Sequence, residues 1–182
     1  MLKDKMPYNG LPKPRVELLE QLLARSTWPL RLARLFGVPN RTRVRTHRIR
    51  VSVGLGSSTL RLGFAADFHT GPSTDPAAIT TACEALARAN VHALLLGGDF
   101  VGARADYFEE LAPQLAAIPA PLGKFAVLGN HDYWTGAEQV RAGLRALGCH
   151  VLENANVRLP EPFDSVWICG LDDDWTGRPD GR

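Results

Sequence analysis

Three short segments of the chain carry side chains that can bind metals or move protons. They are Asp67-Phe68-His69, Gly98-Asp99 and Gly129-Asn130-His131-Asp132, and each follows a short apolar run. Carboxylates, a carboxamide and imidazoles together suit divalent cations of intermediate hardness, such as Mn²⁺, Fe²⁺, Zn²⁺ or Co²⁺, better than they suit calcium. We therefore predict a metal site built from these segments.

Phosphate ester hydrolysis is the chemistry that such a site favours. Two cations roughly 3.5 to 4 Å apart can hold a hydroxide between them and neutralise the attacking and leaving oxygens. Asp99 comes from the middle segment and has two carboxylate oxygens, so it is the natural bridge between two cations. His131 could stabilise or protonate the departing oxygen, because the pKa of an imidazole lies near neutral pH.

Each segment taken alone has a plainer explanation, because Asp-x-His occurs by chance and Gly-Gly-Asp is often only a turn. The spacing of the three is more specific. Asp67 to Asp99 is 32 positions and Asp99 to Asn130 is 31, each about the length of one strand–helix–strand unit. Successive strand ends would then bring all three segments to one edge of a sheet, which is where open α/β sheets bind ligands.

The elements that position these segments alternate between strand and helix. Apolar runs at 60–66, 91–96 and 124–128 are typical of strands buried on both faces. Helical patterns follow them and open at Asp75-Pro76, at Asp106 with Glu109, and at Thr135 with Glu138. This alternation predicts an α/β fold with a mainly parallel sheet and right-handed crossovers.

The last part of the chain has shorter elements. Residues 149–152 and 156–159 read as short strands around a turn, and residues 165–170 as one more buried strand. The three aspartates that follow, Asp172 to Asp174, either line the site or form an exposed acidic turn.

Composition is that of a globular protein with an uneven charge distribution. Of 182 residues, 45% are hydrophobic and 22% charged. Residues 1–50 hold 12 basic and 3 acidic side chains, which gives +9, and the remainder gives −7, for a total of +2. We predict a basic helical arm over residues 1–40 and one domain over residues 41–182. Neither a bilayer-spanning apolar run nor a signal peptide pattern is present, so we expect a cytoplasmic protein.

The arm allows two interpretations. A short helix is expected after Pro29, with Leu32, Leu35 and Phe36 apolar and arginines among them. Residues 28–36 could rest on anionic lipid, as a peripheral contact with the inner membrane. The plainer interpretation is a helix that docks on its own domain and keeps its arginines in water.

Residues 41–50 are rich in arginine, which raises the question of nucleic-acid binding. Apolar residues from Ile49 onward alternate with polar ones, as in a strand that is half buried, and a turn at 54–58 leads back to Leu60. This pattern predicts a hairpin with its basic side in water. No recognised nucleic-acid-reading motif accompanies the charge, so we expect no nucleic-acid partner.

The three segments, in this order and spacing, resemble the calcineurin-like metallophosphoesterase superfamily over about residues 58–175. Tyr133-Trp134 and Gly170-Leu171-Asp172-Asp173 look closest to its bacterial branch of membrane-associated phosphoesterases and UDP-diacylglucosamine pyrophosphatase-like enzymes. The resemblance implies a two-sheet β-sandwich flanked by helices and a hydrolase of phosphoester or pyrophosphate bonds. Its substrate would be a phosphorylated small molecule or a lipid-linked phosphate.

The resemblance also implies roles for the individual residues. Asp67 and His69 would bind one cation, Asp99 would bridge both, and Asn130 would bind the second. His131 would be the catalytic residue that acts on the phosphate or the leaving group.

Two departures from the family pattern affect this prediction. The family continues with a further histidine and a Gly-His-x-His motif, whereas only His150 follows His131 here, and Gly102 stands where the close branch usually has aspartate. We therefore expect a metallophosphoesterase fold that is incomplete at its C-terminus, as in a truncated gene product. The alternative is a catalytically inactive remnant of this fold that acts, if at all, in binding or at a membrane surface.

Overall fold

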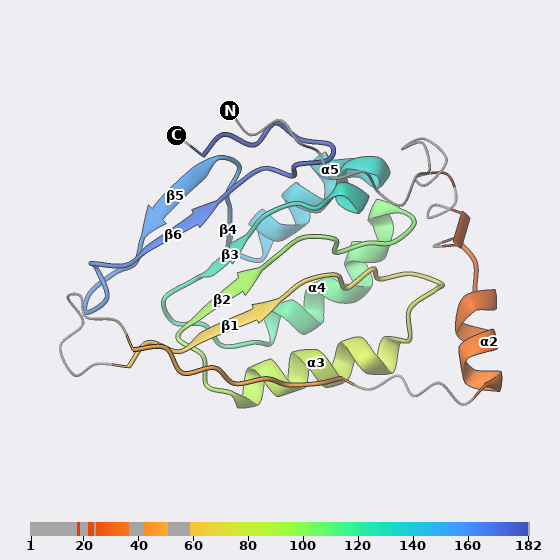
Figure 1. Cartoon of the computed structure of the whole chain (residues 1–182), viewed down its shortest axis with the longest axis horizontal. Helices are drawn as coiled ribbons and strands as arrows, with labels where there is room; N and C mark the ends of the chain where they lie inside the picture. Colours follow the sequence, from red (N-terminus) through yellow and green to blue (C-terminus); the bar gives the residue numbers. More distant parts are fainter. Residues whose placement is uncertain (1–17, 19–21, 24, 37–41, 51–58, 182) are drawn as a thin grey trace.

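The fold is built on a four-stranded parallel sheet. A computed structural model of the chain describes residues 18, 22, 23, 25–36, 42–50 and 59–181. The strands run in the order β1-β2-β3-β4 across the sheet (Figure 1), with bounds Leu62–Ala65, Ala93–Leu96, Lys124–Ala126 and Cys149–Val151. Each of the first three strands ends where one of the predicted site segments begins, as the sequence predicts.

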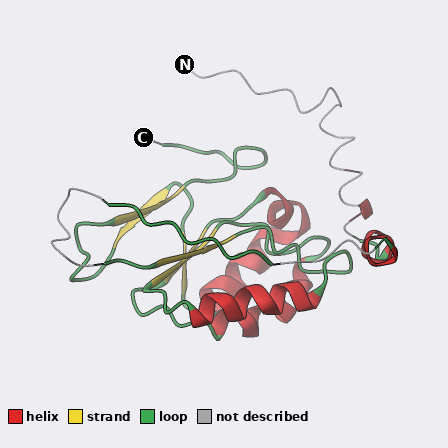
Figure 2. Cartoon of the chain, turned by 60° about the horizontal axis from the view of Figure 1, so that its bottom comes forward, coloured by secondary structure: helices red, strands yellow, loops and turns green. Residues whose placement is uncertain are grey.

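Helices cover one face of this sheet (Figure 2). They are α3 (Pro76–Arg88), the 3₁₀ turn η1 (Ala105–Tyr107), α4 (Phe108–Ala116) and α5 (Asn130–Ala146). Strand residues such as Leu94 and Leu96 are buried against Leu111 of α4 and Val140 of α5. The packing of helices on a parallel sheet confirms the predicted α/β class.

A second, smaller sheet lies over the other face. It pairs β5 (Ala155–Arg158) with β6 (Trp167–Gly170) in antiparallel fashion. A second apolar cluster, which includes Phe125 of β3, Leu152 and Phe163, fills the space between the two sheets. The described chain therefore has a helical layer, a parallel sheet and a two-stranded sheet, which is the predicted helix-flanked sandwich.

Two expectations about the last part of the chain were wrong in detail. Residues 149–152 and 156–159 do not pair with each other, because β4 joins the edge of the parallel sheet and β5 pairs with β6. The segment 165–170 is not a buried strand: Trp167 is 55% exposed and only Gly170 of β6 is buried. The two-stranded sheet has one face toward the core, so its alternate residues point to solvent.

The predicted starts of the helices had mixed outcomes. Asp75 caps α3 as expected, because its carboxylate accepts a hydrogen bond from the backbone of Ala77. The capping box at Asp106 was wrong, since Asp106 binds Arg104 instead and η1 precedes α4.

The start predicted for the next helix, at Thr135, was also wrong. The helix α5 begins at Asn130, with Gly129 as its N-cap, and is interrupted at Gly136. Asn130, His131 and Asp132 are therefore the first turn of a helix rather than part of a loop.

The basic arm is described only in part. α2 (Trp28–Leu35) forms where a helix was expected. Most of the arm before α2 lies outside the described residues, as does the hairpin turn predicted at 54–58. Residues 42–50 form no strand, and Ile49 is exposed, so the alternating pattern there has no layer to pack against. Among the helices of the described ranges, none is long and apolar enough to span a bilayer.

Candidate metal centre

The loops after β1 and β2 run side by side at the edge of the sheet. The backbone N–H of Asp67 donates to the carbonyl of Gly98 at 3.0 Å, and that of His69 donates to the carbonyl of Asp99 at 2.9 Å. These bonds continue the pairing of β1 with β2 beyond the strands. As a result, the first two predicted segments are held together by backbone hydrogen bonds.

Three of the predicted ligands have a left-handed backbone. The φ angles are 58° at Asp67, 44° at His69 and 54° at Asp99. Such conformations cost about 1 to 3 kcal/mol for residues other than glycine and cluster at functional sites. Glycine would adopt these conformations without cost, so a polar side chain at each position fits a role as a ligand.

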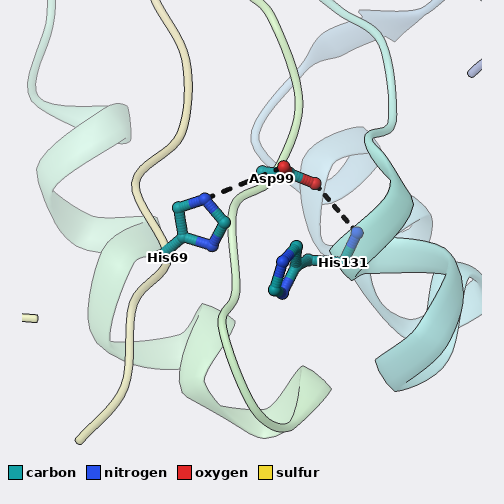
Figure 3. A group of neighbouring side chains, drawn as sticks. All are labelled: His69, Asp99 and His131. Atoms are coloured by element: carbon teal, nitrogen blue, oxygen red, sulfur yellow. Dashed lines mark hydrogen bonds and ion pairs between the residues drawn. The ribbon is translucent and has the colours of Figure 1, made fainter. Parts of the chain in front are cut away.

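His69, Asp99 and His131 form one close group (Figure 3), with one ligand atom from each lying within 4.8 Å of the others. The Nε2 atom of His69 lies 3.7 Å from Asp99 Oδ2 and 3.7 Å from Asp67 Oδ1. These separations exceed hydrogen-bond length, so the three atoms are near neighbours rather than hydrogen-bond partners. The side chain of Asp67 is 72% exposed and lies at the open side of the group.

His131 is held in place from both ends. Its backbone N–H, in the first turn of α5, donates to Asp99 Oδ1 at 2.9 Å. Its ring Nδ1 lies 3.2 Å from the carbonyl oxygen of Gly102. Because a carbonyl only accepts, Nδ1 carries the proton in this contact, and Nε2 of the neutral ring is then an acceptor. Asn130 is the neighbouring residue and is half-buried at the start of the same helix.

Burial lowers the pKa of His69, and the nearby imidazole of His131 lowers it further. The carboxylates of Asp99 and Asp67 act in the opposite direction, but the net shift is downward. His69 is therefore neutral at lower pH than an ordinary histidine. A neutral imidazole is the form that binds a metal.

Asp132 is a residue of the site that the sequence analysis did not assign. Its side chain is fully buried and accepts four backbone hydrogen bonds, from the N–H groups of Asp99, Phe100, Val101 and Gly129. Burial raises the pKa of Asp132 to about 7, against these donors, which favour the ionised form. The carboxylate thereby links the loop after β2 to the start of α5. An acidic residue three positions after the N-cap Gly129 was the sequence signal for this role.

Two glycines permit this close approach of the loops. A side chain at Gly98, which has φ of 90°, would lie 2.5 Å from the backbone nitrogen of Gly129. A side chain at Gly129 would collide with the carboxylate of Asp99. Both glycines of the predicted segments are therefore needed for packing of backbone against backbone.

Aromatic side chains continue from His131 along the surface. The ring of Trp134 lies 4.8 Å from that of His131, and the ring of Trp175 lies 5.7 Å from that of Trp134. The neighbouring Tyr133 donates a 2.5 Å hydrogen bond to Asp172. The acidic turn matches neither interpretation fully: Asp172 and Asp173 are half-buried, only Asp174 is exposed, and none of the three belongs to the group of His69, Asp99 and His131.

The donor set fits a divalent cation. The carboxylate of Asp99 and the imidazoles of His69 and His131 form the close group, Asp67 adjoins it beside His69, and the lowered pKa of His69 reduces competition by protons. An α/β sheet whose strand ends gather such donors defines the class of metal-dependent α/β proteins.

Within that class, the chain belongs to the calcineurin-like phosphoesterase family, because the family model of that description matches residues 60–172, more than half of the chain. The matched region begins just before β1 and ends after β6. It contains all five of the predicted site residues.

Several relatives carry related names. The chain is 35% identical over 109 residues to an uncharacterized metallophosphoesterase of Aquifex aeolicus, covering 60% of this chain and 41% of the relative. It is 28% identical over 118 residues to a transmembrane protein with metallophosphoesterase domain of Danio rerio, covering 63% and 27%. It is 38% identical over 77 residues to the UDP-2,3-diacylglucosamine pyrophosphatase LpxG of Chlamydia trachomatis, covering 42% and 23%. The chain thus spans about two fifths or less of each of these relatives.

Proposed function

We propose that this chain supplies the metal site of a hydrolase that cleaves phosphoester or pyrophosphate bonds with two divalent cations. The observation that carries the proposal is the convergence of His69, Asp99 and His131 from three separate strand ends. In this assignment Asp67 and His69 would hold one cation, Asn130 would hold the other, and Asp99 would contribute to both. Mn²⁺, Fe²⁺, Zn²⁺ and Co²⁺ all suit these donors.

Bound cations would supply Lewis-acid stabilisation of charge on the phosphate. The chain supplies the remaining functions. The contact with Gly102 orients the ring of His131, and the N-terminal turn of α5 presents it at the group. When protonated, Nε2 of His131 would donate to the leaving oxygen as a general acid. Asp132 keeps the backbone of Asp99 in its left-handed conformation, so the carboxylate stays aimed at His69.

Hydrolysis of bis(p-nitrophenyl) phosphate in the presence of Mn²⁺ tests this proposal. We expect turnover that disappears with Asp99→Asn and with EDTA. Asp164→Asn is the matched control, because Asp164 is paired with Arg158 on the surface, away from the site. If wild type hydrolysed the substrate no faster than Asp99→Asn, the proposed hydrolase activity would be rejected in favour of a catalytically inactive remnant of the fold.

The substrate in this proposal is a phosphorylated small molecule or a lipid-linked phosphate. The lipid-linked option is supported by the name of the Chlamydia relative and by the surface of α2. No residue of α2 is buried, and Trp28, Leu32, Leu35 and Phe36 are exposed together with arginines of the same segment. Exposed aromatic and aliphatic side chains beside arginine suit the interface of an anionic bilayer.

Flotation with vesicles that contain anionic phospholipid tests the peripheral contact. We expect the protein to float with the vesicles, and Leu35→Ser combined with Phe36→Ser to abolish flotation. The control is Phe64→Ser, since Phe64 on β1 is 67% exposed but lies outside the basic arm. Equal flotation of both variants would dismiss the contact through residues 28–36.

A further inference from the structure

A cavity of about 350 Å³ lies next to the metal centre. The loop that follows Asp99 and the first turns of α5 form its walls, and the arm contributes Arg25. Trp134 separates the cavity from the site, because its ring contacts His131 and also lines the cavity. A group placed here is therefore one indole ring away from His131, and the volume falls in the range of ligand sites.

The lining of the cavity is suited to an anion. Arg104 is oriented by Asp106, which accepts from Nε at 3.0 Å and from a terminal nitrogen at 2.5 Å. Arg25 is exposed, and within the described ranges no ion pair is formed by it. Two guanidinium groups face one carboxylate, so the lining carries a net positive charge, and Gln139 adds an amide. Guanidinium groups bind phosphate oxygens through paired hydrogen bonds.

We propose that this cavity is a subsite for a second anionic group of the substrate, such as the second phosphate of a diphosphate. Arg25 and Arg104 would contact that group, and Trp134 would form the wall along which the substrate passes from the metal centre. The inference rests on the proposed function for the identity of the reaction, but binding at the cavity does not require the metal. Arg25 belongs to the basic arm and lies just before α2, so this proposal gives the arm a direct part in substrate choice.

Pyrophosphate binding by the metal-free protein is the direct test. Calorimetry in EDTA at low ionic strength should detect binding, because exposed charge pairs are screened by salt. Arg25→Gln should weaken binding about three- to fivefold, the effect of one exposed ionic contact. Asp106→Asn should tighten it by a similar factor, since Asp106 is the one carboxylate among the described residues that line the cavity. Arg31→Gln is the matched control, because Arg31 lies on the exposed surface of α2 outside the cavity.

Kinetics with metal supply a second measurement. Arg25→Gln should raise KM for a diphosphate diester such as UDP-glucose and leave kcat unchanged, with no effect on bis(p-nitrophenyl) phosphate. Absence of pyrophosphate binding, or equal weakening by Arg25→Gln and Arg31→Gln, would overturn the subsite. Because the binding measurement contains no metal, a protein that binds pyrophosphate but hydrolyses nothing would refute only the proposed function.

Discussion

Replacing Asp132 by asparagine keeps the size of a fully buried side chain but removes its charge and one of its two acceptor oxygens. One carboxylate oxygen accepts from Asp99 and Gly129 at 2.9 and 3.0 Å, and the other from Phe100 and Val101 at 2.9 and 3.4 Å. Whichever oxygen becomes the amide nitrogen, two N–H groups lose their acceptor and face another donor; those of Phe100 and Val101 are buried, and those of Asp99 and Gly129 are half-buried.

The magnitude follows from those two groups. A buried donor left without a partner costs about 1 to 3 kcal/mol, so two cost about 2 to 6 kcal/mol. Asparagine also avoids burying a charge, which offsets part of the loss, and we expect a net destabilisation of about 3 kcal/mol. A domain whose free energy of unfolding is about 5 to 15 kcal/mol would stay folded, with Tm lowered by about 10 °C. The Asp99 loop would lose its anchor, so Mn²⁺ affinity should fall about 10- to 100-fold.

Thermal unfolding in EDTA at pH 8, followed by calorimetric titration with Mn²⁺, measures both effects. Asp173→Asn is the matched control: Asp173 also accepts backbone bonds, from Trp175 and Thr176, but in a half-buried turn. Its Tm should fall by much less and its Mn²⁺ affinity should not change. A Tm of Asp132→Asn equal to that of wild type would refute the reasoning, because buried donors would then have lost their acceptor without cost.

Three further predictions concern the same centre. Gly129→Ala places a side chain against the Asp99 carboxylate, so Mn²⁺ affinity should fall, whereas Gly181→Ala, which meets nothing within 4 Å, should leave it unchanged. His131→Asn should lower kcat about 10²- to 10⁴-fold while calorimetry still detects metal, and loss of metal would instead make His131 a ligand. Because burial lowers the pKa of His69, its imidazole signal in an NMR titration of the metal-free protein should have a midpoint below 6.5, and a midpoint above that value would contradict the shift.

The sequence was informative where local pattern and tertiary role coincide. Asp67, Asp99 and Asn130 follow apolar runs that form adjacent parallel strands, and parallel strands end at the same edge of a sheet. Two of the three other histidines, His92 and His150, make structural contacts. His92 accepts a hydrogen bond from the backbone of Arg61, and His150 stacks on Phe125, both away from the centre.

The role of Asp132 depends on contacts that no local pattern contains. Thr135 and Glu138 had the form of a capping box, and Asp132 was equally able to cap from an earlier position. The start of α5 is decided by the loop at 99–101. The N–H groups of this loop need an acceptor that only Asp132 reaches among the described residues. In the same way, the cavity combines Arg25 with Arg104, residues far apart in the sequence whose proximity requires the folded chain.

The left-handed residues explain why these polar anchors are needed. Asp67, His69 and Asp99 together carry a conformational cost of about 3 to 9 kcal/mol, comparable to the net stability of a domain. The hydrogen bonds between the two loops and the buried carboxylate of Asp132 offset that cost within the chain itself. Hydrogen bonds within the chain therefore support the geometry of the centre. For a hydrolase this is the useful arrangement, because donors that are already positioned do not have to be reordered when metal or substrate binds.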